Sequence, residues 1–257
     1  MKIRISKNEE KFIKFLDQFE MDIFTFSDLR YNEHTGIDHL QMTIDSLVKR
    51  EYLIRLEKGK YCRHNFKDEY VIGSVLANGG IIAYWSALNI HGLTEQIPNT
   101  VFVQTSKVKK NKTVLGVNYR FIKVKSSKIT GIEKMGYGNH SYLITDREKT
   151  MIDCFDLPEY AGEFPGIIRA FINHDWDEEK LIDYAKVVNN RAAIKRIGYI
   201  AELFDLPMTK FIAFAKSKVT RTIDLIDNNS PDEGTYITDW GLKLNIEKED
   251  LLNMKYY

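Results

Sequence analysis

The stretch IDHLQMTIDSLVKREYLIRLEKGKYCR (37–63) sets the expected fold of the first part of the chain. Its first half repeats apolar residues at helical spacing on one face, and Thr35 just before it is the expected N-cap. Its second half places Lys58 and Gly59 between two short apolar runs. This is a hairpin signal, because Gly59 accepts a positive φ without a Cβ clash. The stretch therefore predicts a helix followed by a β-hairpin.

The residues before this stretch extend the pattern. Residues 7–20 carry phenylalanines and a leucine at helical spacing, residues 24–26 alternate like a very short strand, and Ser27 can cap a brief helix through Leu29. The order helix, strand, short helix, longer helix and hairpin predicts a winged helix-turn-helix over residues 1–66. Residues 67–257 are expected to form a second domain of mixed α/β structure, so the predicted fold class is α+β.

The second helix of a helix-turn-helix enters the major groove of DNA, and its outward residues near the N-terminus meet base edges. A helical wheel over residues 37–50 places four residues opposite the buried stripe, and Thr35 lies at the start of the helix. Cations at the end of this helix and in the wing are expected to contact phosphates. The candidate DNA contacts in this module are Thr35, His39, Met42, Ser46, Lys49, Arg50, Arg55, Lys58 and Lys60.

A second interpretation is that this module uses the same surface for protein contacts. Asp38 lies beside the candidate face and would repel phosphate, and Met42 has no hydrogen-bond donor. Residues 1–63 hold twelve lysines and arginines against eleven acidic residues, so the module is close to neutral. DNA binding is the favoured function by fold analogy, because a small winged helix at a chain start is most often a DNA module.

The second domain is predicted to contain strands with an uneven distribution of charge. The runs TVFVQT (100–105) and VNYRFIKVK (117–125) are rich in β-branched and aromatic residues. From residue 104 to residue 128 there are eight basic residues and no acidic one, a segment that we name the basic ribbon. The ribbon either follows a nucleic-acid backbone or protects a sheet edge with lysines. Its basic residues are Lys107, Lys109, Lys110, Lys112, Arg120, Lys123, Lys125 and Lys128.

A cluster of charged residues follows the strand expected over residues 140–145. Asp146, Glu148, Lys149 and Asp153 permit a metal-dependent nuclease, in which carboxylates hold the metal and a lysine lies beside the phosphate. The favoured interpretation is structural, since Thr145 and Glu148 have the spacing of a capping box. Further helices are expected over residues 79–93, 166–174, 178–189 and 191–205, and late strands over residues 235–247.

Composition narrows the class of protein. The chain has 257 residues with 44% hydrophobic and 28% charged residues and a net charge of +1, typical of a soluble globular protein. Cys62 and Cys154 lack zinc-ligand spacing and suit a reducing compartment, and no apolar stretch is long enough to cross a membrane. No phosphate-binding, hydrolase or dinucleotide motif occurs. We therefore expect a cytoplasmic protein that is not an enzyme and has no catalytic residues, metal or cofactor.

A negative segment offers another possible partner surface. Residues 153–183 hold nine acidic residues against two basic ones. They either present a face to a protein partner or form a solvated helix surface, and the second explanation is the commoner one. A pure protein-interaction module is thus a further alternative.

Three later segments, taken with the predicted winged helix, resemble a known family. They are YWSALNIHGLTEQIPNTVFVQT (84–105), YLITDREKTMIDCFDLPEYAG (142–162) and NNRAAIKRIGYIAELF (189–204). In combination they are similar to the AbiEi family of antitoxins, which belong to type IV toxin–antitoxin and abortive phage infection systems. The resemblance extends from Lys7 to Leu242.

The resemblance implies a function that the residues alone do not show. The N-terminal domain would bind inverted repeats of double-stranded DNA in its own promoter and repress transcription. The C-terminal domain would carry the antitoxin activity, and the basic ribbon would touch DNA. The functional partner would be a nucleotidyltransferase toxin of the AbiEii type, which the antitoxin counters without necessarily forming a stable complex.

Overall fold

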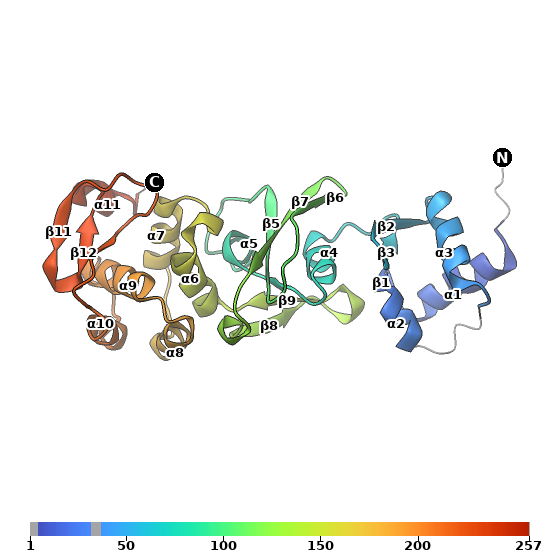
Figure 1. The fold of residues 1–257 in the computed structure, drawn as a ribbon, viewed down its shortest axis with the longest axis horizontal. Coiled ribbons are helices and arrows are strands. Elements are labelled where there is room, and N and C mark those ends of the chain that lie inside the picture. Colours follow the sequence, from blue (N-terminus) through green and yellow to red (C-terminus); the bar gives the residue numbers. More distant parts are fainter. Residues whose placement is uncertain (1–4, 32–36, 257) are drawn as a thin grey trace.

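The computed structural model describes residues 5–31 and 37–256, which have a mixed α+β fold with eleven α-helices and three sheets. Three parts follow one another along the long axis in the order of the sequence (Figure 1). The first is a small helical unit with a three-stranded sheet. The second is built on a six-stranded sheet, and the third combines helices with another three-stranded sheet.

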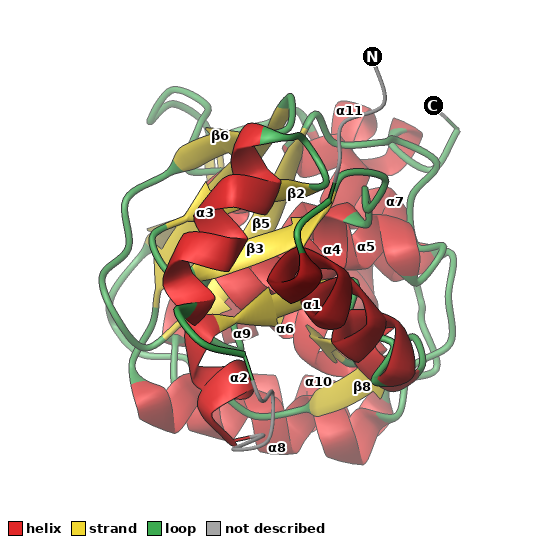
Figure 2. Ribbon diagram, turned by 90° about the vertical axis from the view of Figure 1, so that its right-hand side faces the viewer, coloured by secondary structure: helices red, strands yellow, loops and turns green. Residues whose placement is uncertain are grey.

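The first part contains the helices and the hairpin that the sequence predicts. Its sheet is antiparallel in the order β1-β3-β2, and Gly59 makes the hairpin turn with a φ of +77°. In Figure 2, α1 and α3 lie nearest the viewer, with the hairpin behind them. The elements are α1 (Lys7–Gln18), β1 (Ile23–Thr25), α2 (Phe26–Tyr31), α3 (Leu40–Lys49), β2 (Leu53–Glu57) and β3 (Lys60–Arg63).

The expected apolar stripes form the core of the first part. Phe12 and Leu16 from α1 pack with Ile44 and Leu47 from α3, and all four are buried. Phe24 of β1 meets the Phe12 ring edge-on, with centroids 5.8 Å apart. The helical period of the two stripes thus predicted which residues would be inside.

The start of α3 differs from the expectation. The helix begins at Leu40, and its N-cap is His39 in the left-handed region with a φ of +56° and no side-chain cap bond. Thr35, the predicted N-cap and DNA contact, lies outside the described residues. Ile37 precedes the helix and still packs against the core.

The second part is a mixed sheet in the order β6-β7-β5-β4-β9-β8. Pairs β5–β7 and β4–β9 are parallel, and the other pairs are antiparallel. The strands predicted over residues 100–105, 117–125 and 140–145 and the helix before them are confirmed, whereas α4, β4, β6 and β8 were not foreseen. The elements are α4 (Glu69–Leu76), β4 (Ile81–Ile82), α5 (Tyr84–Ile90), β5 (Thr100–Thr105), β6 (Lys112–Val114), β7 (Val117–Lys123), β8 (Ile132–Met135) and β9 (Tyr142–Thr145).

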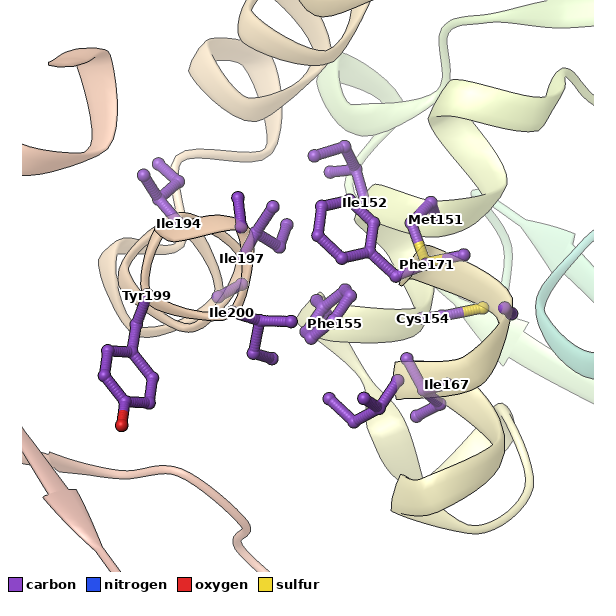
Figure 3. Close-up of a cluster of buried hydrophobic side chains, with 14 of the residues drawn as sticks. Met151, Ile152, Cys154, Phe155, Ile167, Phe171, Ile194, Ile197, Tyr199 and Ile200 are labelled. Atoms are coloured by element: carbon purple, nitrogen blue, oxygen red, sulfur yellow. The ribbon is translucent and has the colours of Figure 1, made fainter. Parts of the chain in front are cut away.

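The third part packs helices around one apolar core. Figure 3 shows this core, where Phe155 of α6 and Phe171 of α7 face Ile197 and Ile200 of α9. The two phenylalanine rings meet edge-on at 5.7 Å. The elements are α6 (Arg147–Asp156), α7 (Phe164–Ile172), α8 (Glu178–Val188), α9 (Arg191–Leu203), α10 (Thr209–Lys216), β10 (Asp224–Leu225), β11 (Thr235–Ile237), β12 (Leu242–Leu244) and α11 (Lys248–Asn253).

The first and second parts share buried residues. Ile23, Leu56 and Cys62 of the first part belong to the same apolar cluster as Val103 and Tyr119 of the second. The predicted boundary between residues 66 and 67 falls between β3 and α4 and stays a prediction. The shared core means that the first part does not hang on a loose linker.

Among the described residues, every helix is too short or too polar to cross a bilayer.

Candidate nucleic-acid interface

The outward face of α3 is the predicted base-reading surface. Met42 is 70% exposed, and His39 and Lys49 are also exposed. Asp38 is exposed beside them, as the sequence suggested. These three candidates are therefore available to a partner.

Ser46 and Arg50 are placed differently, because both contact the buried carboxylate of Glu9. The Ser46 hydroxyl donates to Glu9 at 2.7 Å, and the Arg50 Nε lies 3.3 Å from the same carboxylate. Glu9 also accepts from the Ser6 backbone N–H at 2.6 Å in a capping box that starts α1. Burial opposes its ionisation, but the hydrogen bonds from Ser6 and Ser46 outweigh it and keep the pKa of Glu9 below its ordinary value. Ser46 thus joins α3 to α1, and its predicted contact with DNA stays a prediction.

The basic residues of the β2–β3 hairpin, the predicted wing, differ in exposure. Arg55 and Lys58 are exposed. Lys60 is buried, and its ammonium donates to the Leu76 carbonyl at 2.7 Å and lies 2.8 Å from Glu57. Burial lowers the pKa of Lys60, although Glu57 favours its charged form. Lys60 was predicted to contact phosphate, but it attaches the hairpin to α4.

The Glu57 carboxylate also contacts two lysines of the basic ribbon. Lys109 donates to both of its carboxylate oxygens at 3.1 and 2.9 Å, and the Lys112 ammonium lies 3.7 Å away. Lys112 also donates to the Leu56 carbonyl at 2.6 Å. Burial opposes ionisation of Glu57, but Lys60 and Lys109 outweigh it and lower its pKa. We name Glu57 and its three lysines the junction cluster. Lys109 and Lys112 thus connect the first part to the second, whereas the sequence predicted that they contact DNA.

A second set of contacts also joins the first part to the second. Asn139 donates to the backbone carbonyls of Phe19 and Glu20 at 2.7 and 3.0 Å. His140 lies 2.8 Å from the Asp22 carboxylate. Two separated sets of polar contacts and a shared apolar core therefore hold the first part at one orientation to the six-stranded sheet.

The remaining ribbon residues do not share one face. Lys107, Lys110, Lys123 and Lys125 are exposed. Arg120 is also exposed, and its guanidinium lies 4.7 Å from the centroid of the Tyr160 ring. Because side chains alternate along β7, Arg120 and Lys123 lie on opposite faces of the sheet. The basic run in the sequence is thus not one basic surface in the fold.

The predicted nuclease cluster contains a buried ion pair. Lys149 is 0% exposed and contacts Asp153, which also accepts from the Gln104 amide at 2.9 Å. Gln104 bonds the buried Tyr84 hydroxyl at 3.0 Å in turn. Burial raises the pKa of Asp153, although Lys149 favours its charged form. This arrangement connects α6 to β5 and α5 in the interior, with no surface for a substrate phosphate.

The start of α6 corrects the predicted capping box. Asp146 is the N-cap and accepts from the Lys149 backbone N–H at 2.8 Å, whereas the Thr145 hydroxyl lies 2.7 Å from that of Thr150. The Asp146 carboxylate also accepts from the Tyr184 hydroxyl at 2.6 Å. No group of three or more potential metal ligands occurs among the described residues.

The acidic segment 153–183 uses much of its charge inside the chain. Asp177 caps α8 by accepting from the backbone of Glu179 and Lys180. Glu178 accepts from the Phe211 backbone N–H at 2.7 Å, and Glu179 pairs with Lys210. These contacts join α8 to α10, so an acidic sequence segment is here in large part helix capping and packing.

Sequence reasoning missed the residues that organise these sites. Ser6 and Glu9 have the spacing of a capping box, a local signal that could have placed Glu9 at the start of α1. The contacts of Glu9 with Ser46, of Glu57 with Lys109 and of Asn139 with Phe19 gave no signal, because they join residues far apart in the chain. The excess of lysines around residue 110 was visible. The single carboxylate that three of them surround became apparent only when the parts were placed in space.

Comparisons with known proteins add a likeness of fold. No family model matches the chain, and no curated protein matches it. A solved structure that it resembles is that of the RV2827C protein from Mycobacterium tuberculosis, with a TM-score of 0.66 and 14% sequence identity. The match covers 93% of this chain and 92% of that one. At this identity the likeness concerns the fold alone, and it extends over nearly all three parts.

Proposed function

We propose that this chain is a DNA-binding transcriptional autorepressor and the antitoxin of a type IV toxin–antitoxin system, as its resemblance to the AbiEi family implies. The observation that supports DNA binding most is the order of elements in the first part, helix, strand, helix, helix, strand and strand, with a β1-β3-β2 sheet. That order fits a winged helix-turn-helix in which α3 is the recognition helix and the β2–β3 hairpin is the wing.

The proposed interface is narrower than the sequence suggested. On α3 it comprises His39, Met42 and Lys49, and on the wing it comprises Arg55 and Lys58, all exposed. Lys107, Lys110, Lys123 and Lys125 are the ribbon residues that remain available for phosphate. The predicted contacts left out are those that form contacts within the chain, namely Ser46, Arg50, Lys60, Lys109, Lys112 and Arg120.

The fixed joint between the parts supports this proposal. A domain that is already oriented loses less freedom when it binds, so weak surfaces on both parts can act together. The proposed ligand is double-stranded DNA of the chain's own promoter with inverted repeats, which places the protein in the cytoplasm. The proposed functional partner is a nucleotidyltransferase toxin of the AbiEii type.

One experiment in cells tests both activities separately. The adjacent toxin gene is expressed from an inducible promoter, with and without this chain, and a reporter under the chain's own promoter is read in parallel. We expect restored growth and a repressed reporter. The double variant Arg55→Glu, Lys58→Glu should lose repression and keep the rescue, because the antitoxin activity is assigned to the later parts.

A control variant makes the same change in charge far from the proposed DNA surface. Arg221→Glu, Lys248→Glu alters two exposed cations of the third part and should leave repression intact. An unrepressed reporter with wild-type protein would refute autorepression, and growth arrest despite abundant protein would refute the antitoxin assignment.

A further inference from the structure

A polar pocket of about 550 Å³ lies between the second and third parts of the molecule. It is enclosed by the loop after α5, by α7, and by the residues that follow α11, and both ribbon views place α7 beside the C-terminal end (Figures 1 and 2). This volume is in the range of small-molecule sites. The lining residues that matter here are Thr94, Glu95, Arg169, Asn173, His174 and Lys255.

Arg169 is the distinctive member of this lining. It is partly buried on α7, and within the described residues its guanidinium has no ion pair, hydrogen bond or aromatic contact. The other described arginines that are similarly shielded all have partners. Arg50 pairs with Glu9, Arg63 with Asp17, and Arg196 with the Leu225 carbonyl. A shielded guanidinium with five unused donors favours an anion that is not part of the chain.

A histidine and a lysine line the same pocket. The Nδ1 of His174 lies 2.9 Å from the Ala170 carbonyl, and since a carbonyl only accepts, this nitrogen carries the proton. The Nε2 of His174 is therefore the ring nitrogen left for a ligand. The Lys255 ammonium lies 4.6 Å from the centroid of the Tyr256 ring, and Glu95 is the acidic residue of the lining.

The dipole of α7 gives a competing explanation for two of these residues. Arg169 lies in the last turn of α7 and His174 just after it, where the carbonyl end of a helix favours cations. The dipole accounts for the position of the Arg169 charge, but it supplies no partner for the guanidinium. It also leaves unexplained why Lys255, from a different segment, lies in the same pocket.

We propose that this pocket binds a small phosphate-bearing anion. Arg169 would hold two phosphate oxygens through its planar fork, Lys255 would add a point charge, and the Nε2 of His174 would face the ligand. Gly92 and Gly166 widen the pocket because they carry no side chain. This binding site is separate from the DNA surface of the first part and does not depend on the function proposed above.

Calorimetric titration of the full chain tests the proposal, with inorganic phosphate and adenosine 5′-monophosphate as separate probes. We expect saturable binding at one site. Arg169→Gln should weaken binding at least about tenfold. The affinity of Arg169→Lys should lie between those of wild type and Arg169→Gln, because lysine keeps the positive charge but lacks the planar guanidinium that binds two oxygens. Tighter binding of the nucleotide than of phosphate would assign a nucleoside phosphate, and equal affinity would assign a free phosphate.

A second variant fills the pocket without changing any of its charged residues. A Cβ at Gly166 would meet the Gln96 side chain at 3.9 Å, an ordinary contact, so Gly166→Leu can fold while its side chain fills the pocket. Gly166→Leu should abolish phosphate binding, although Arg169 and Lys255 are retained. Arg221→Gln changes an exposed arginine elsewhere in the third part and should bind phosphate like wild type.

The proposal is overturned if no saturable binding is seen up to about 10 mM ligand, the weak end of the affinity scale. It is equally overturned by unchanged affinity in Arg169→Gln or Gly166→Leu, or by an equal loss in Arg221→Gln.

Discussion

Glu9 is the residue on which the packing of the first part depends. Its carboxylate is 2% exposed and binds Ser6, Ser46 and Arg50, so it joins the start of α1 to the end of α3. A buried carboxylate that keeps hydrogen-bond donors on both sides is costly to remove, because the donors lose their partner. Glu9 therefore adds polar contacts to the apolar packing that positions the proposed recognition helix against α1.

Replacing Glu9 tests this dependence. Glu9→Gln should lower the free energy of unfolding at pH 7 by about 1–3 kcal/mol, since the charge-assisted bonds are lost. Its pKa is lowered in the folded state, so its contribution is present above the unfolded value of about 4.3 and lost as the pH falls through the folded value. The difference between wild type and variant in urea unfolding should accordingly shrink at about pH 3.5.

Glu10 serves as the matched control for Glu9. It is the neighbouring residue, and its exposed carboxylate pairs with Lys14 one helical turn away. Glu10→Gln should leave the unfolding midpoint close to that of wild type. An equal loss in both variants would mean that general charge, and not the contacts of Glu9, stabilises α1.

The buried pair of Lys149 and Asp153 gives the second test at this scale. Lys149→Met leaves an uncompensated buried carboxylate and should cost about 3–5 kcal/mol in urea unfolding. Lys149→Met with Asp153→Leu should recover part of that loss, because no unpaired charge remains. A nuclease built on this pair would instead lose cleavage while keeping its stability. Full stability in Lys149→Met would contradict the structural role.

At the scale of elements, the joint between the hairpin and the basic ribbon is the feature with the clearest consequence. Glu57 lies where β2 departs from regular pairing, between Arg55 and Glu57, and three lysines meet its carboxylate. Three ammonium groups around one carboxylate repel one another once that carboxylate is gone. The contacts of Lys109 and Lys112 with Glu57 join residues far apart in sequence, so the cluster connects the hairpin to the basic ribbon.

A double-mutant cycle on Glu57 and Lys109 measures this joint. We expect Glu57→Gln and Lys109→Gln each to lower the thermal midpoint, with a coupling energy of about 1 kcal/mol between them. Lys110→Gln, an exposed neighbour, should show no coupling to Glu57→Gln. Additive effects of Glu57 and Lys109 would mean that the contact does not join the two parts.

The elements also show how much could be predicted from the sequence. Amphipathic helices such as α1, α8 and α9 and the β-branched strands β5 and β7 were predictable, because burial of one face imposes a period on the residues. Strands β4 and β10, of two residues each, carry no period and exist only through pairing with distant strands. Ser46 and Lys60 had the right residue type and position for DNA contact, but a wheel cannot show that Glu9 or Leu76 lies within reach.

For the whole molecule, three parts in a row make an elongated shape with the proposed DNA surface at one end (Figure 1). The phosphate pocket lies between the second and third parts. The joint between the first two parts keeps the wing and the ribbon in one orientation. The buried network of Tyr84, Gln104, Lys149 and Asp153 connects the second part to the third. A near-neutral chain can thus place exposed cations at defined positions without a large net charge.

The affinity of the purified chain for its own promoter tests the central claim most directly. Fluorescence anisotropy at several salt concentrations gives both the dissociation constant and the slope of its logarithm against the logarithm of the salt concentration. We expect tight, steeply salt-dependent binding. Arg55→Glu, Lys58→Glu should weaken it and reduce the slope by about 2, and Arg221→Glu, Lys248→Glu should match wild type. Salt-independent binding, or equal affinity of the wing variant and wild type, would contradict a winged helix that grips DNA through α3 and the β2–β3 hairpin.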